Sequence, residues 1–148
     1  MLQIITKNFS ELTTDELYAM LQLRSEVFVV EQDCVYQDID YKDQKAVHIL
    51  GYKKQKLIAY TRIFKPGDYF SEASIGRVVV AKNERSFNYG HILMQHSIEA
   101  IKDYFNEVII KISAQQYLKK FYETHQFTQV GEWYLEDDIP HIPMIKNN

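Results

Sequence analysis

The chain has 148 residues, which is enough for one domain with a substantial core. Its 17 Lys and Arg residues are outnumbered by 20 Asp and Glu residues. The resulting net charge of -3 argues against a nonspecific nucleic-acid binder, which usually carries a basic surface. The five glycines are too far apart for GxGxxG or GxxxxGKS/T, which disfavours a dinucleotide-binding Rossmann finger and a P-loop NTPase. Aromatic residues make up 14% of the chain and indicate a large core or a ring-lined groove.

Cysteine content and the N-terminal segment predict a cytoplasmic protein. Cys34 is the only cysteine, so neither an internal disulfide nor a zinc site with several cysteines can form. The segment MLQIITKNFSEL lacks the basic region and the long apolar run of a signal peptide. No stretch approaches 18 consecutive apolar residues, so we expect no association with a membrane.

The first half of the chain predicts four strands and one helix. Thr13 and Glu16 form a capping box, and apolar residues follow at helical spacing as far as Phe28. The polar, acidic segment 31–44 indicates a long loop that could carry function. The predicted strands are 3–6, 46–52, 57–64 and 74–80, the second and third joined in a hairpin through Lys-Lys-Gln-Lys.

The second half continues the alternation, with helices predicted at 90–105 and 115–125 and strands at 107–113, 127–130 and 133–145. This order favours one mixed α/β domain over residues 1–148, with helices on both faces of a mixed sheet. The strand–helix–strand unit at 74–113 should be parallel, with its ligand site at the carboxyl end of the first strand.

The segment 78–90 combines a strand end, a polar loop and a helix start. The first turn of a helix presents unpaired amides and a partial positive charge that suit a pyrophosphate. Arg85, five residues before Gly90, could add a charge-assisted contact. Every strand-to-helix turn offers such amides, so these residues alone favour an ordinary turn over an anion site.

The same segment resembles the acetyl-CoA loop of the GCN5-related N-acetyltransferase (GNAT) family, whose usual pattern is Q/R-x-x-G-x-G/A. Arg85 matches its first position and Gly90 its last, whereas Asn88 stands where the middle glycine is common. Asn is the next-best residue for a positive φ, which allows a similar loop path. The segment 119–127, KKFYETHQF, resembles the family motif F-Y-x-x-x-G-F, with Gln126 in place of its glycine.

Three longer strings are similar to the ElaA-like group within this family: LYAMLQLRSEVFVVEQDCVYQDID (17–40), SIGRVVV (74–80) and DDIPHIPM (137–144). The resemblance implies the acyl-CoA N-acyltransferase fold, with a central twisted mixed sheet splayed between its fourth and fifth strands. It also implies direct transfer of an acetyl group from acetyl-CoA, as co-substrate, to a primary amine of a small molecule or peptide.

The resemblance further implies site residues. A backbone N–H near Val79 would stabilise the oxyanion, and Tyr122 would be the general acid whose phenol, near pKa 10, suits a thiolate leaving group. The residues expected to bind the cofactor are Val78, Val79, Val80, Arg85, Ser86, Phe87, Asn88, Tyr89, Gly90 and His91.

The acceptor amine must lose a proton, and the sequence offers several bases. Glu31, Asp38, Asp40, His48 and His141 are the candidate bases, and His141 lies between two prolines, which is typical of a rigid, exposed strand edge. Asp38 and Asp40 are also candidate substrate contacts, because the acidic loop suits a cationic acceptor, and His48 is a further candidate contact. Arg77 lies on a central strand, where it would bind an acidic substrate group or pair with a loop carboxylate.

The sequence leaves two functions open and limits the partners. His91 and His96 lack the spacing of a chelating pair, so we expect no metal. Cys34 has no adjacent histidine and is expected to be inert. The alternative to an enzyme is a non-catalytic acyl-CoA sensor. The replacement of two motif glycines by Asn88 and Gln126 favours this alternative. No nucleic-acid partner is expected, and an exposed sheet edge would allow a homodimer.

Overall fold

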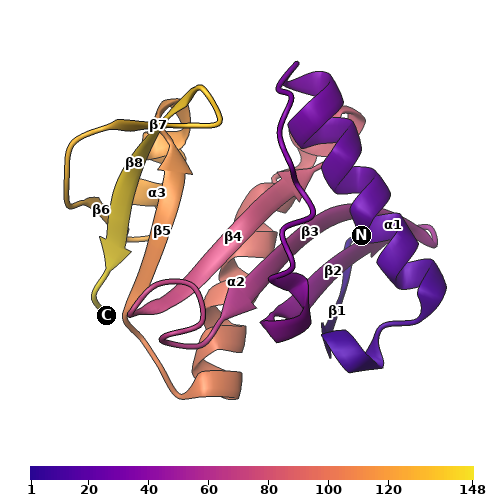
Figure 1. The fold of residues 1–148 in the computed structure, drawn as a ribbon. Coiled ribbons are helices and arrows are strands. Elements are labelled where there is room, and N and C mark those ends of the chain that lie inside the picture. The colour runs from indigo at the N-terminus through magenta and orange to yellow at the C-terminus, as the bar shows by residue number, and fades with distance from the viewer.

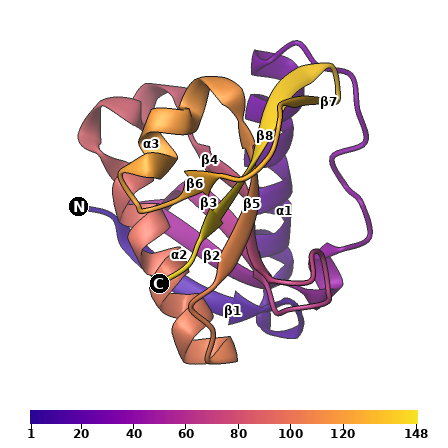
Figure 2. The ribbon, with the colours of Figure 1, turned by 90° about the vertical axis from the view of Figure 1, so that its left-hand side faces the viewer.

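A computed structural model, which describes all 148 residues, shows one open mixed sheet with helices on both faces (Figures 1 and 2). The strands follow the order β1-β2-β3-β4-β5-β8-β6, and β7 pairs with β8. Their bounds are β1 Gln3–Asn8, β2 Val47–Lys53, β3 Lys56–Phe64, β4 Ala73–Val80, β5 Ile110–Gln115, β6 Thr128–Gln129, β7 Tyr134–Glu136 and β8 Ile139–Lys146. The α-helices are α1 Thr14–Arg24, α2 Tyr89–Phe105 and α3 Lys119–Glu123. The predicted mixed α/β fold is thus confirmed.

Two apolar clusters lie on opposite faces of the sheet. Figure 2 shows α1 on one face and α2 with α3 on the other. Met20 and Leu23 of α1 belong to the smaller cluster, whereas Leu93 and Met94 of α2 belong to the larger one. Side chains of a strand alternate between faces. The strands β2, β3 and β4 therefore contribute to both clusters, and helices pack on both faces of this part of the sheet.

The helix α1 begins at the predicted capping box and ends in an unusual turn. The Thr13 Oγ1 accepts from the Glu16 amide at 3.1 Å, and Glu16 Oε1 accepts from the Thr13 amide at 2.8 Å. After Arg24 the chain continues as a π-helical turn, Ser25–Glu31. Such wide turns often occur at functional sites. This one brings Phe28 and Gln32 toward the centre of the sheet.

The parallel pair β4–β5 separates almost at once. Its register contains only Ala73 opposite Ile110 and Ser74 opposite Lys111, and beyond these residues the strands diverge (Figure 1). A bulge in β4, where Arg77 has a φ of 51°, accompanies the divergence. The splay predicted from the family resemblance is present, and it leaves one edge of β4 without a neighbouring strand.

The C-terminal elements differ from the predicted ones in three ways. The strand β5 begins at Ile110, because Val108 and Ile109 are exposed, whereas Ile110, Ile112 and Ala114 enter the core. The helix predicted at 115–125 is divided into a 3-10 turn, Gln116–Leu118, and the short α3. The long last strand is a hairpin, whose turn residues Asp137 and Asp138 both have positive φ. None of the helices has the length and hydropathy needed to cross a membrane.

Candidate active site

Two cavities meet in the gap between β4 and β5. The larger, which we call the groove, has a volume of about 450 Å³ and extends along β4 toward the start of α2. The smaller, which we call the acceptor cavity, has a volume of about 100 Å³ and extends toward β7 and β8. The residues that line both are Phe28, Gln32, Val78, Gln115, Leu118 and Tyr122. A molecule in the groove would therefore meet a molecule in the acceptor cavity beside these side chains.

The groove brings together most of the residues predicted to bind the cofactor. Those lining it are Val78, Val79, Val80, Arg85, Asn88, Gly90 and His91. Ser86, Phe87 and Tyr89 do not line it, and their part in wrapping a pyrophosphate stays a prediction. Phe87 and Tyr89 instead face Lys53, whose ammonium lies 4.2 and 5.5 Å from their ring centroids.

The two positions where the family motif usually has glycine keep a left-handed backbone. Asn88 has φ 62° and ψ 20° immediately before α2, and Gln126 has a φ of 70° after α3. A left-handed conformation is least costly for Gly and next for Asn or Asp. The positive φ expected at Asn88 is thus confirmed, and Asn88, Gly90 and His91 at the start of α2 line the groove.

The backbone of β4 corrects the residue chosen for oxyanion stabilisation. The Ala81 amide donates to the Ile58 carbonyl of β3 at 2.8 Å. Bonded and non-bonded pairs alternate along an antiparallel ladder. The Val79 amide, opposite Tyr60, therefore also faces β3, whereas the amides of Val78 and Val80 face the open edge. Val78 lines both cavities, so its N–H, and not that of Val79, is placed for this role.

Tyr122 occupies the junction between the cavities. Its side chain extends from α3 and is only 6% exposed, with Phe121 and Phe127 packed edge-on against its ring. The phenol makes no hydrogen bond within the protein, so its O–H is free for a bound molecule. Burial raises the pKa of Tyr122 well above 10, so the predicted match to a thiolate is less close than expected. The same shift keeps the phenol protonated and able to donate.

Arg85 and Glu31 form a bidentate ion pair across the mouth of the groove. The guanidinium Nη1 lies 2.6 Å from Glu31 Oε2, and Nη2 lies 2.8 Å from Glu31 Oε1. The Arg85 Nε also donates to the Val80 carbonyl at 3.0 Å, on the open edge of β4. The hydrogen bonds from Arg85 lower the pKa of Glu31. Both carboxylate oxygens are engaged, so this geometry does not favour Glu31 as the base.

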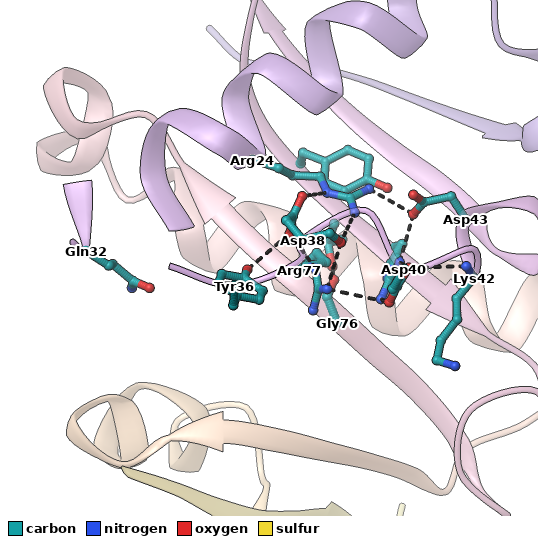
Figure 3. Close-up of polar contacts among 12 residues, drawn as sticks. Arg24, Gln32, Tyr36, Asp38, Asp40, Lys42, Asp43, Gly76 and Arg77 are labelled. Atoms are coloured by element: carbon teal, nitrogen blue, oxygen red, sulfur yellow. Dashed lines mark hydrogen bonds and ion pairs between the residues drawn. The ribbon is translucent and has the colours of Figure 1, made fainter. Parts of the chain in front are cut away.

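The acidic loop is neutralised by arginines, contrary to its interpretation as a free anionic surface (Figure 3). Asp38 lies 2.9 Å from Arg24 and 2.8 Å from Arg77. Asp40 meets Arg62 at 2.6 Å. The interpretation of the loop as a substrate-facing surface is therefore wrong for Asp38 and Asp40, and Arg77 makes the internal pair that was one of its two predicted roles. The loop instead closes one wall of the acceptor cavity.

Asp43 completes this arginine–aspartate cluster, and no pattern in the sequence predicted its central position. It accepts from Arg24 and from Arg62, each at 2.8 Å. Burial alone would raise the pKa of Asp43, but the charge and hydrogen bonds of Arg24 and Arg62 lower it. The cluster contains three arginines and three aspartates, so its formal charges cancel.

His48 is a core residue, which makes its predicted role in substrate binding wrong. Its side chain is inaccessible to solvent, with Nδ1 2.6 Å from the Tyr60 hydroxyl and Nε2 2.9 Å from the Asp43 carbonyl. Both ring nitrogens are thus occupied, and burial lowers the pKa of the imidazole. His48 supports the Asp43 segment from behind and lines neither cavity.

His141 does reach the acceptor cavity, although it does not lie on an exposed edge. It is on β8, which has β5 on one side and β6 and β7 on the other. The Nδ1 lies 2.7 Å from the Ile139 carbonyl, and the ring stacks on Tyr134. Nearby, Ser113 donates to Glu136 Oε1 at 3.0 Å.

Glu136 and Ser113 also line the acceptor cavity, although neither was predicted as a site residue. The available signal was the pair Asp137-Asp138, which suits a tight hairpin turn. That turn places Tyr134 opposite His141 in the ladder. Because alternate residues of a strand share a face, Glu136 lies on the same side as Tyr134 and His141.

Other reactive side chains have ordinary surroundings. The Cys34 thiol donates to the Asp137 carbonyl at 3.1 Å, and burial and nearby aspartates raise its pKa. His91 and His125 approach one another at 3.0 Å beside the groove. The structure contains no cluster of three or more His, Cys, Asp or Glu side chains that could hold a metal ion.

Comparisons with known proteins agree with this geometry. The family model described as acetyltransferase (GNAT) domain matches residues 10–148. The chain is 44% identical to protein ElaA of Escherichia coli strain K12 over 139 residues, covering 93% of this chain and 91% of ElaA. The crystal structure of Escherichia coli ElaA superposes with a TM-score of 0.92 at 41% identity, covering 99% of this chain and 100% of ElaA.

A crystal structure titled as an acyl-CoA N-acyltransferase from Pseudomonas aeruginosa superposes with a TM-score of 0.93. It is 40% identical to this chain, and the alignment covers 99% of both proteins. The match over nearly the whole chain, together with the splayed sheet and the loop before α2, shows that this chain belongs to the GNAT family of acetyltransferases, in its ElaA-like group.

Proposed function

We propose that this protein is an acyltransferase that moves an acetyl group from acetyl-CoA directly to a primary amine. The observation that carries the proposal is the position of Tyr122, whose free hydroxyl lies where the groove and the acceptor cavity meet. Family membership supports acyl-CoA as the donor, and the groove has the residues that such a donor requires.

An acyl-CoA in the groove would meet three sets of residues in turn. At one end, the first amides of α2 and the side chain of Arg85 would hold the pyrophosphate. Along the middle, the unpaired edge of β4 offers backbone groups to the two amides of a pantetheine arm, as a neighbouring strand would. The thioester would then lie beside Val78 and Tyr122.

The reaction needs three contributions from the protein. The amine nitrogen would attack the thioester carbon to form a tetrahedral intermediate, which then collapses as the C–S bond breaks and the CoA thiolate leaves. The Val78 amide would donate to the carbonyl oxygen as negative charge develops there. Tyr122 would donate its proton, or a strong hydrogen bond, to the departing thiolate. A base on the acceptor side must receive the proton that the amine loses.

Two measurements test this function. Isothermal titration calorimetry should detect binding of acetyl-CoA, and release of free thiol should follow when a panel of primary amines is added. Binding without turnover on any amine would favour a non-catalytic sensor. Absence of binding would contradict both functions.

A further inference from the structure

The acceptor cavity contains two hydrogen-bond acceptors that face one another without a donor between them. The Ile139 carbonyl can only accept, so the Nδ1 atom of His141, 2.7 Å away, carries the hydrogen of the neutral ring. The Nε2 atom is then an acceptor, and it makes no hydrogen bond. Glu136 Oε2 lies 3.7 Å from it. Two acceptors at this separation can both receive hydrogen bonds from one cationic nitrogen about 2.8 Å from each.

The charge of the cavity also favours a cation. Four charged side chains line it, two arginines and two acids. Arg62 and Arg77 already belong to the arginine–aspartate cluster, in which three guanidinium groups face three carboxylates. Glu136 and Asp137 have no such partner. The cavity therefore presents negative charge that has no arginine partner, whereas both of its arginines are already paired with carboxylates of the protein.

The remaining wall is aromatic. Tyr69 and Phe70, from the loop between β3 and β4, line the cavity with ring centroids 4.8 Å apart. Phe64 stacks on Tyr69 at 5.1 Å. Ring faces attract cations and bury apolar groups. The body of the acceptor should therefore be apolar or aromatic.

We infer that the acceptor is an apolar or aromatic primary amine without a carboxylate, bound as its ammonium ion between Glu136 and His141. This inference rests on the proposed function. One ammonium proton passes to His141 Nε2, which forms an imidazolium that Glu136 stabilises. The neutral amine is left to attack the thioester. His141 is thus the catalytic base, and Glu136 is the residue that recognises the charge.

Binding of three probes in the presence of CoA tests the recognition without any turnover. They are 2-phenylethylamine, 2-phenylethanol, which lacks the charge, and phenylalanine, which adds a carboxylate. Calorimetry should show the amine binding at least about tenfold more tightly than either of the others, as expected for charge-assisted hydrogen bonds. Equal binding of the alcohol or of phenylalanine would overturn the inference. So would CoA binding with none of the three probes bound.

Matched variants separate recognition from folding. The Glu136→Gln change keeps the shape and the acceptor for Ser113, and it should weaken 2-phenylethylamine binding about tenfold. The control Glu132→Gln removes the same charge from an exposed residue outside the cavity and should change nothing. Should Glu136→Gln fail to fold, Glu136→Asp keeps the charge while retracting it, and should also weaken binding. Unchanged affinity in a folded variant would contradict the role of Glu136.

The role of His141 is tested by its effect on kcat. An asparagine can donate its side-chain amide to the Ile139 carbonyl, as Nδ1 does, but it has no counterpart of Nε2. We expect His141→Asn to lower kcat for 2-phenylethylamine about a hundredfold, the typical effect of a general base, with a smaller change in KM. An unchanged kcat would overturn this role. All variants should bind acetyl-CoA as the wild type does. If the wild type itself did not bind acetyl-CoA, the proposed function would be contradicted instead.

Discussion

At the scale of single residues, Tyr122 is distinguished by what it does not touch. The chain has ten other tyrosines, and several of them are exposed to solvent or hydrogen-bonded within the protein. Tyr122 combines burial with a free hydroxyl at the junction of two cavities. This combination is costly for a purely structural residue, because a buried polar group normally finds a partner.

We expect Tyr122→Phe to lower kcat at least about tenfold while acetyl-CoA affinity stays within a few-fold, because proton donation typically contributes about 10²–10⁴. Steady-state thiol release measures kcat, and calorimetry measures affinity. Tyr18→Phe is the matched control, since Tyr18 is 76% exposed and lines neither cavity. If kcat of the Tyr122→Phe enzyme equals that of the wild type, Tyr122 has no part in the chemistry.

The Arg85–Glu31 pair gives a second residue-scale prediction, which separates two roles for Glu31. Replacing Arg85 with alanine removes a charge-assisted contact to phosphate and should weaken acetyl-CoA binding at least about tenfold at low salt. Glu31→Gln frees the guanidinium, so it should leave the affinity unchanged or increase it. Calorimetry at low salt measures both. A large loss of kcat in Glu31→Gln, with normal affinity, would instead restore Glu31 as the base.

At the scale of elements, the connection between β4 and α2 depends on one left-handed residue. A non-glycine residue without a short polar side chain pays about 1–2 kcal/mol in this conformation. Asn88→Ala should therefore lower the free energy of unfolding by about 1 kcal/mol and weaken acetyl-CoA binding, whereas Asn88→Gly should do neither. Urea denaturation and calorimetry measure the two effects. Equal behaviour of the alanine and glycine variants would show that the left-handed conformation does not matter.

Elements differed in how well the sequence predicted them. The capping box fixed the start of α1 correctly, because its two hydrogen bonds are local. The π-helical turn after Arg24 had no such signal, since its apolar residues fit helical spacing equally well. The strand β5 was placed too early because Val108 and Ile109 are apolar yet exposed. Features that depend on neighbouring residues in the chain could thus be predicted from the sequence. Burial could not, because it depends on which strands pair.

The same distinction applies to the site. The loop with Arg85, Asn88 and Gly90 is contiguous in sequence, so its motif could be recognised, and the structure places all three in the groove. The acidic loop was misread because its arginine partners come from α1, β3 and β4, and no local pattern shows those pairs. Glu136 was missed for a related reason, since its importance arises only when the β7–β8 hairpin folds.

At the scale of the whole molecule, the arginine–aspartate cluster and His48 make stability depend on pH. Arginine contacts lower the pKa of Asp43 in the folded state, in spite of its burial, while an unfolded Asp titrates near pH 4. Below about pH 4 the unfolded state therefore binds more protons, and stability is lost as the pH falls. Burial lowers the pKa of His48, so a first, smaller loss should begin below about pH 6.5.

We expect the free energy of unfolding, measured with urea between pH 3 and pH 7, to decrease slightly below about pH 6.5 and more strongly below about pH 4 as the pH falls. Asp43→Asn should cost about 3–5 kcal/mol at pH 7, because it leaves Arg24 and Arg62 short of a buried partner. The variant should also lose less stability than the wild type below about pH 4. A variant with the same acid dependence as the wild type would show that Asp43 does not cause that loss.

The short pairing of β4 with β5 has a consequence for cooperativity. The antiparallel strands β1 to β4 and the group β5 to β8 share backbone hydrogen bonds only near Ala73 and Ser74. Between them lies an unpaired strand edge that an extended ligand with two amides can complete. Such a ligand would act as an additional strand, joining two ladders into one. A bound acyl-CoA would thus supply hydrogen bonds that the sheet itself lacks. The two groups of strands should therefore become more rigid relative to one another as the groove fills with ligand.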